Sequence, residues 1–340
     1  MTAVPSPQPP TPKRRSFPWW AYILLFLGGC TGFGMLLNAQ EEQQYDKALK
    51  AYQAGDCETA LKEFNQLLKG KSAGNKSDRV TSARAKKAEC DALGLGEVQQ
   101  KAGKPDQAIV RYTNFAASYP SSPLRGKVQQ SMTELFQKGD LKKLAQPGVC
   151  NKLKVLIDQK LVPDPQKNGP PFYQACGQQL EAKKQYTDAV KIYEMFLAQY
   201  PKHALEPQIK AALARSLVAE ARAAGAGNIP APGVSGYSGS GATTVVIQNE
   251  TPNKLRIVFS GPQPRFEELA PCPNCVKFKG RGPSGCPNKG PVGTYTLKPG
   301  NYDVVVKTEG GNALPFTGKW ALGDGSEYNS CFFIVQRSSS

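Results

Sequence analysis

The pattern of apolar and polar positions divides the chain into three parts. Residues 16–40 carry no charged side chain and are rich in Trp, Leu, Phe and Gly, which predicts a transmembrane helix. Apolar residues recur at helical spacing between residues 41 and 225, so we expect a helical domain there. Apolar and polar residues then alternate in short runs between Gly/Pro turns, which predicts a small β domain over residues 243–340.

The N-terminal tail, residues 1–15, is expected to be disordered and cytoplasmic. It is Pro-rich and ends in Lys13, Arg14 and Arg15. Such a composition cannot bury a core, and a basic flank favours the cytoplasmic side of a membrane. We therefore expect residues 16–40 to cross a bacterial cell membrane once, with the bulk of the chain on the periplasmic side.

Two other hypotheses concern the same apolar segment. Leu27, Gly28 and Gly29 precede Cys30 and resemble the lipobox of bacterial lipoproteins, which would be cleaved and acylated at Cys30. A cleaved secretory peptide is the third hypothesis. The apolar segment continues from Thr31 to Ala39, which favours the uncleaved anchor because a cleaved lipoprotein would not need it. Under all three hypotheses, the rest of the chain is exported from the cytoplasm.

The helical region repeats one hairpin pattern. Three segments share an alanine followed four positions later by an aromatic residue: Ala60 and Phe64, Ala108 and Tyr112, Ala189 and Tyr193. The second and third also share a glycine twelve positions before the alanine and a proline twelve positions after it: Gly96 and Pro120, Gly177 and Pro201. Small residues permit close helix approach, and proline stops the second helix. A turn residue five positions before each alanine is expected at Gly55, Gly103 and Lys184.

The pattern resembles the tetratricopeptide repeat, in which helical hairpins stack into a superhelix. The matching positions are Leu95, Gly96, Gly103, Ala108, Tyr112 and Pro120 in the second copy, and Cys176, Gly177, Lys184, Ala189, Tyr193 and Pro201 in the third. The ending of these copies resembles that of repeats in bacterial envelope assembly factors. The resemblance implies a concave face that binds a protein partner, with Gln99, Gln100 and Gln179 as exposed contact residues. Tyr112 and Tyr193 are expected to belong to the core.

The copies are unevenly spaced, so intervening segments must differ from the repeat. Residues 121–168 are expected to form a divergent pair of helices, and Pro163 to Pro171 a loop. Leu205 to Ala224 are apolar at roughly helical period and predict a final capping helix.

The C-terminal part begins after a change in composition. Residues 226–242 are almost entirely Gly, Ala, Ser and Pro, which predicts a flexible linker. Turns at 250–253, 298–301 and 323–325 each separate two alternating runs and predict three hairpins. The expected fold is a multidomain α + β protein: a transmembrane helix, a tetratricopeptide-like helical solenoid and a small antiparallel β-sandwich.

The cysteines leave three interpretations of the β domain open. Cys272, Cys275, Cys286 and Cys331 could form two disulfides, bind a structural zinc ion through four thiolates, or remain free thiols. An exported location favours disulfides, and it also suggests pairs between Cys57 and Cys90 and between Cys150 and Cys176. A redox-active CxxC is not favoured, because Pro273 and Asn274 lie in a Pro/Gly-rich loop and not at a helix N-terminus.

Composition and charge exclude several classes of function. The net charge of +16 is spread along the chain, which argues against nucleic acid as a partner. The chain has a single histidine, His203. Any Ser-His-Asp triad would therefore have to use His203, and a metal site with two imidazoles is excluded. No catalytic or cofactor motif is present. The sequence predicts a non-enzymatic interaction protein without a cofactor.

An alternative function is binding to the cell wall or to a carbohydrate through the β domain. If they are exposed, its candidate sugar platforms are the aromatic residues Tyr237, Tyr295, Trp320 and Tyr328.

Overall fold

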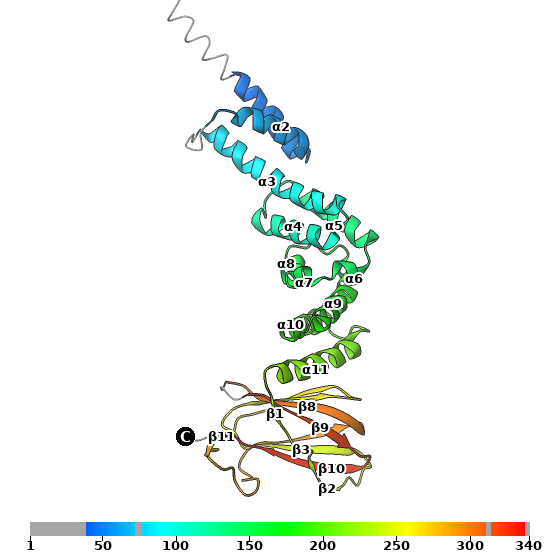
Figure 1. Ribbon diagram of the computed structural model, residues 1–340. Coiled ribbons are helices and arrows are strands. Elements are labelled where there is room, and N and C mark those ends of the chain that lie inside the picture. The colour runs from blue at the N-terminus through cyan, green and yellow to red at the C-terminus, as the bar shows by residue number, and fades with distance from the viewer. Residues whose placement is uncertain (1–38, 72–76, 311–313, 337–340) are drawn as a thin grey trace, which may run out of the picture. The chain divides into compact units, whose positions relative to one another are not determined.

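The computed structural model describes residues 39–71, 77–310 and 314–336 (Figure 1). They form two compact units: the first contains the chain up to residue 94 together with 121–126, and the second contains the remainder. The predicted tail, Cys30 and nearly all of the predicted anchor lie outside the described residues. Among the residues that are described, no helix has the length and apolar character needed to span a membrane.

The first unit contains the first predicted hairpin. A helix over residues 39–53 precedes α2 (Cys57–Leu68), and α3 (Asp78–Lys101) follows and continues into the second unit. The side chain of Asp56 accepts a 3.1 Å hydrogen bond from the backbone N–H of Thr59 and so caps α2. Ala60 and Phe64 are fully buried. The Cys57–Cys90 disulfide joins α2 to α3, as predicted.

The second unit contains the other helices. They are α4 (Pro105–Ser118), α5 (Arg125–Lys138), α6 (Leu141–Leu144), α7 (Pro147–Cys150), α8 (Leu153–Asp158), α9 (Pro165–Ala182), α10 (Tyr186–Gln199) and α11 (Glu206–Ala223). Within this unit α9, α10 and α11 pack consecutively against one another, and the Cys150–Cys176 disulfide joins α7 to α9. The region predicted as a divergent helix pair contains α5 and three short helices. The loop predicted over Pro163 to Pro171 is wrong, because α9 begins at Pro165.

The repeat glycines lie where the sequence pattern requires them. A methyl group on Gly177 would lie 2.1 Å from the ring of Tyr193, and one on Gly96 would lie 2.3 Å from the ring of Tyr112. Both tyrosines are fully buried, as expected for core residues. Each glycine therefore lets the aromatic ring of the following helix reach the backbone of the preceding one.

The turns between the helices of each hairpin also match the prediction. Gly55, Gly103 and Lys184 have φ angles of 75°, 68° and 58°, in the left-handed region that favours glycine. The third repeat thus keeps the turn geometry with a lysine in place of the glycine.

The C-terminal strands form two main sheets and a small one. The five-stranded sheet has the order β1 (Gly227–Asn228), β9 (Phe316–Leu322), β8 (Gly300–Thr308), β4 (Leu255–Ser260), β5 (Arg265–Leu269). The four-stranded sheet has the order β2 (Gly233–Tyr237), β10 (Ser326–Phe332), β3 (Thr243–Asn249), β7 (Val292–Leu297). Strands β6 (Phe278–Lys279) and β11 (Val335–Gln336) form the third.

The prediction of a purely antiparallel fold is wrong. Strands β10 and β3, β1 and β9, and β11 and β6 pair in parallel. The three predicted hairpins are also wrong, because each of their turns connects a strand of one main sheet to a strand of the other. The turn residues stop a strand and reverse the chain, but they do not determine which sheet the next strand joins. Side chains of both main sheets, including Val245, Phe259 and Trp320, share one hydrophobic core.

The predicted flexible linker, residues 226–242, instead belongs to the sheets. Strand β1 pairs with β9, and β2 pairs with β10. Between them the buried Ile229 joins the β core, and the indole N–H of Trp320 donates a 3.1 Å hydrogen bond to the carbonyl of Pro230. A segment of this composition can still be ordered when its backbone groups complete the edges of two sheets.

Helix α11 packs on the outer face of the five-stranded sheet (Figure 1). Ala214, Val218 and Ala221 of the helix contact Val258 of β4 and Val305 of β8. Two ion pairs flank this contact, Arg222 with Asp303 at 2.6 Å and Arg256 with Glu194 at 3.0 Å. The last repeat and the β domain consequently form one compact unit.

Candidate partner-binding and cysteine sites

The two well-matched hairpins contain equivalent, partly buried hydrogen bonds. The hydroxyl of Tyr112 donates to Gln100 Oε1 at 2.8 Å, and the hydroxyl of Tyr193 donates to Glu181 Oε2 at 3.0 Å. Both acceptors lie four residues after the repeat glycine. Burial raises the pKa of both tyrosines, and the Glu181 carboxylate raises that of Tyr193 further. Both hydroxyls therefore remain protonated donors at neutral pH.

The glutamines predicted to contact a partner are not freely exposed. Gln99, Gln100 and Gln179 are all half-buried. Gln100 already accepts from Tyr112, and its amide N–H lies 3.5 Å from Glu134 Oε2. The Oε1 atom of Gln99 is buried without a hydrogen-bond partner among the described residues. The expectation that these three glutamines are exposed is wrong, because each is half-buried; their contact with a partner stays a prediction.

A cleft of about 600 Å³ lies in the second unit beside the contact between α11 and the sheet. Helices α10 and α11 form one wall, and strands β4 and β8 form the other. Its apolar lining includes Val190, Leu217, Ala221, Val258, Val305 and Pro315. This volume falls within the range of concave ligand sites, about 300–1,000 Å³.

The charged residues of the cleft are predominantly basic. Lys184, Lys191, Arg256 and Lys307 face two carboxylates, Glu194 and Glu220. Glu194 pairs with Arg256, and Lys191 pairs with Asp188. Arg256 and Lys307 lie directly opposite each other on β4 and β8, an arrangement of like charges that is unfavourable unless an anion accompanies them. The cleft thus combines an apolar lining with an excess of positively charged residues.

Comparison with known families decides what the hairpins are. The family model for the tetratricopeptide repeat matches residues 92–122 and 173–203, which contain the two glycine–tyrosine contacts. The chain therefore contains two tetratricopeptide repeats. No curated protein matches it.

Three of the four sugar platforms proposed for this repeat protein are not accessible. Tyr295, Trp320 and Tyr328 are buried in the β core, and only Tyr237 is exposed, at 84%. Sugar binding by aromatic side chains needs an accessible ring face. The condition of exposure that the platforms require is therefore met by Tyr237 and not by the other three, which are core residues.

The cysteines of the β domain form two separate disulfides, Cys272–Cys275 and Cys286–Cys331. This connectivity was left open by the sequence. The alternative of one zinc ion bound by all four thiolates is not supported, because among the described residues the clustered potential metal ligands are Glu250, Cys272 and Cys275. The sequence pattern gave no reason to include Glu250, since it lies in a turn directly after β3.

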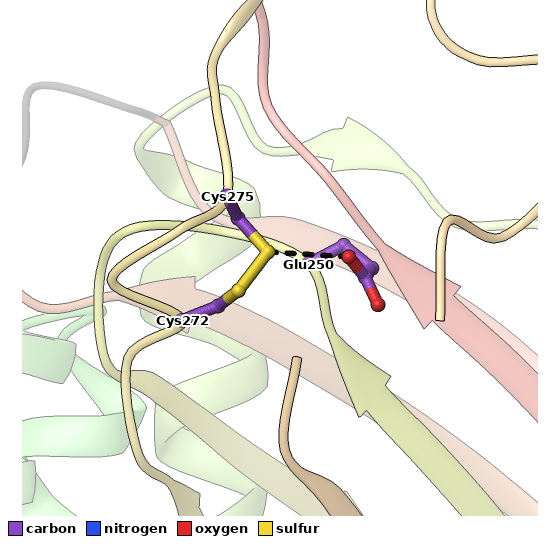
Figure 2. Close-up of side chains that lie close together, drawn as sticks. All are labelled: Glu250, Cys272 and Cys275. Carbon is purple, nitrogen blue, oxygen red and sulfur yellow. Dashed lines mark hydrogen bonds between the residues drawn. A yellow bond between two sulfur atoms is a disulfide. The ribbon is translucent and has the colours of Figure 1, made fainter. Parts of the chain in front are cut away.

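Glu250 extends its carboxylate toward the Cys272–Cys275 disulfide (Figure 2). Its Oε2 atom lies 3.2 Å from Cys275 Sγ. All three residues are buried, with Glu250 only 1% exposed. An adjacent contact, 3.3 Å between Cys286 Sγ and Gln248 Oε1, involves the other disulfide. The residues of this cluster could hold a metal ion only with the disulfide reduced.

Proposed function

We propose that this tetratricopeptide repeat protein is a non-enzymatic, membrane-anchored scaffold of the bacterial cell envelope that holds a protein partner. Repeats of this family serve protein–protein interaction, which supports the general function. The observation that carries the proposal is the cleft between the last repeat and the β domain, which has an apolar lining and an excess of basic residues. It replaces the glutamine face as the proposed contact surface.

The proposed location rests on the sequence and on the cysteines. Residues 16–40 have the length of a transmembrane helix, and the basic residues before them favour a cytoplasmic N-terminus. Four disulfides occur among residues 39–71, 77–310 and 314–336. Disulfides persist in oxidising compartments and are rare in the cytoplasm. They support an exported body, whether the chain is anchored by a helix or by a lipid on Cys30.

The chemistry of the cleft indicates the kind of partner segment. Lys184 and Lys307 enter no ion pair within the described parts of the chain. An extended segment with an apolar side chain over Leu217 and Val258 and a carboxylate near the two lysines would complement the cleft. Electrostatic complementarity of this type contributes specificity and association rate.

A photocrosslinking experiment tests the proposal. A photoreactive amino acid at Thr187, an exposed cleft residue, should crosslink one defined protein in intact envelopes. The same probe at Lys142, an exposed residue of α6 that does not line the cleft, should not capture it. Equal capture from both positions, or capture of glycan alone from the Thr187 position, would contradict a protein-binding cleft.

A further inference from the structure

The two carboxylate oxygens of Glu250 lie in different environments. Its Oε1 atom accepts three hydrogen bonds, from Gln248 Nε2 at 2.7 Å and from the backbone N–H groups of Lys289 and Gly290 at 2.7 and 2.9 Å. Its Oε2 atom has one polar neighbour among the described residues, the sulfur of Cys275. The three donors fix the carboxylate so that Oε2 points at the disulfide (Figure 2).

This arrangement leaves Oε2 without a donor in the oxidised protein. A disulfide sulfur carries no hydrogen, so it cannot donate to the carboxylate. No lysine, arginine or histidine of the described chain forms an ion pair with Glu250. Buried charges in proteins are otherwise paired or coordinate metals. The site therefore lacks a positive group at the point where Oε2 and the two sulfurs meet.

The three side chains supply the ligands that zinc prefers. The two cysteines have C-x₂-C spacing, a common zinc-ligand arrangement, and a carboxylate is an accepted third ligand. Their donor atoms lie within 4.8 Å of one another. Around a tetrahedral Zn²⁺ the same atoms would be roughly 3.5–3.8 Å apart, given metal–ligand bonds of about 2.0–2.3 Å. Once the sulfur–sulfur bond is broken, small movements would place all three around one ion.

The surrounding loop gives access to this site. Pro273 and Asn274, between the two cysteines, are exposed, and Val276 is 63% exposed. The sulfurs thus lie directly beneath a surface loop. Cys286 and Cys331 are outside the cluster and bonded to each other, so they can keep the β domain closed while the first disulfide is reduced.

We propose that Cys272, Cys275 and Glu250 form a redox-controlled site for Zn²⁺ or a similar divalent ion. A dithiol reductant transfers two electrons and two protons to the Cys272–Cys275 disulfide and is itself oxidised to a disulfide. Metal binding then releases the two thiol protons to solvent, and the ion is held by two thiolates and the Glu250 carboxylate. Water occupies the fourth position. Thiol–disulfide exchange with a disulfide oxidant then transfers two electrons from the two thiolates to that oxidant, which becomes a dithiol by taking two protons from solvent; the re-formed Cys272–Cys275 disulfide no longer binds the ion, and the ion is released.

Cobalt titration of the full chain tests the site. The chain is treated with a phosphine until alkylation and mass analysis show Cys272 and Cys275 reduced and Cys286–Cys331 still bonded; the phosphine is then removed without oxygen, and Co²⁺ is added. We expect thiolate-to-Co²⁺ charge-transfer absorption and the visible bands of a tetrahedral ion, both lost when Zn²⁺ is added. The Cys272→Ser/Cys275→Ser variant should lose this signal while every other cysteine is retained, and the Cys286→Ser/Cys331→Ser variant should keep it. The oxidised chain should show none.

The Glu250→Gln variant distinguishes the loss of a metal ligand from the loss of folding stability. The amide oxygen can still accept the bonds now made to Oε1, so the oxidised variant should be at least as stable as the native chain to urea. In the reduced state its affinity for Co²⁺ should fall at least tenfold, since loss of supporting groups alone weakens metal sites about 10–100-fold. Unchanged affinity in this variant, no Co²⁺ spectrum in the reduced native chain, or loss of the spectrum in a Cys286→Ser/Cys331→Ser variant whose circular dichroism is that of the folded chain would each overturn the proposed site.

Discussion

The hydroxyl of Tyr193 donates a 3.0 Å hydrogen bond to Glu181, across the hairpin formed by α9 and α10. Glu181 also accepts a 2.6 Å bond from Ser216 of α11. The carboxylate therefore connects three consecutive helices of the stack. The earlier repeat makes the corresponding bond from Tyr112 to the neutral amide of Gln100.

The difference between these acceptors gives a first prediction. Tyr193→Phe leaves a charged acceptor with one donor fewer and should lower the free energy of unfolding by about 1.5–3 kcal/mol. Tyr112→Phe removes a bond to a neutral amide and should lower it by about 0.5–1.5 kcal/mol. Urea denaturation measures both. Equal losses in the two variants would show that the charge of Glu181 is irrelevant to the stability of the stack.

Two glycines of α3 provide a matched pair. Gly96→Ala forces a methyl group to within 2.3 Å of the Tyr112 ring, whereas Gly94→Ala meets nothing within 4 Å. Overpacking should make Gly96→Ala less stable by about 1–3 kcal/mol. Gly94→Ala should be more stable by roughly 1 kcal/mol, because alanine favours the helix. Thermal unfolding of the two variants checks the signs, and stabilisation by both would be inconsistent with close Gly96–Tyr112 packing.

Close packing of this type was predictable from sequence because both partners belong to one motif at fixed spacing. The sheet order was not, because alternation and turn residues identify strands but not their neighbours. Strand β10 follows β9 after a three-residue turn and yet pairs with β3 and β2. Glu250 could not be predicted as a site residue, since its proximity to Cys275 depends on how the loop carrying the cysteines folds back over β3.

The turn before α10 gives a third stability prediction. Lys184 has a φ angle of 58°, a left-handed conformation that costs a non-glycine residue roughly 1–2 kcal/mol. Lys184→Gly should therefore raise the stability of the chain by about 1 kcal/mol. Gly103→Lys, at the equivalent turn with a φ of 68°, should lower stability by a similar amount. Differential scanning calorimetry would measure both, and the same sign for the two exchanges would refute the shared turn geometry.

Buried tyrosines predict a loss of stability at alkaline pH. Burial raises the pKa of Tyr173 to about 12, and burial together with Glu89 raises the pKa of Tyr52 to about 12. An unfolded tyrosine has a pKa near 10, so the folded state holds these protons more tightly. Stability should be fully present below about pH 10 and fall as pH rises toward 12. Urea unfolding at a series of pH values should show this loss of stability, and tyrosinate absorbance followed in parallel should show that these tyrosines ionise above pH 10. Ionisation of all tyrosines near pH 10 without loss of stability would contradict the prediction.

The two disulfides of the β domain should differ in their contribution to stability. The cysteines of one are 45 residues apart and those of the other 3. Loop-closure entropy then predicts losses of about 4 kcal/mol for Cys286→Ser/Cys331→Ser and about 2 kcal/mol for Cys272→Ser/Cys275→Ser. Urea unfolding of the oxidised variants measures the two losses in free energy of unfolding. A larger loss for Cys272→Ser/Cys275→Ser would contradict the prediction.

The central claim, that the cleft binds a protein partner, is tested most directly by the affinity of the crosslinked partner for two purified variants of the full chain. Lys184→Gly/Lys307→Gln removes two cleft charges, and Lys142→Gln/Lys143→Gln removes two charges from α6. We predict at least tenfold weaker binding for the first pair, about 1.4 kcal/mol, and unchanged binding for the second. Because Lys184→Gly should also stabilise the fold, unfolding would not explain the loss. Equal affinity of both variants would contradict the claim.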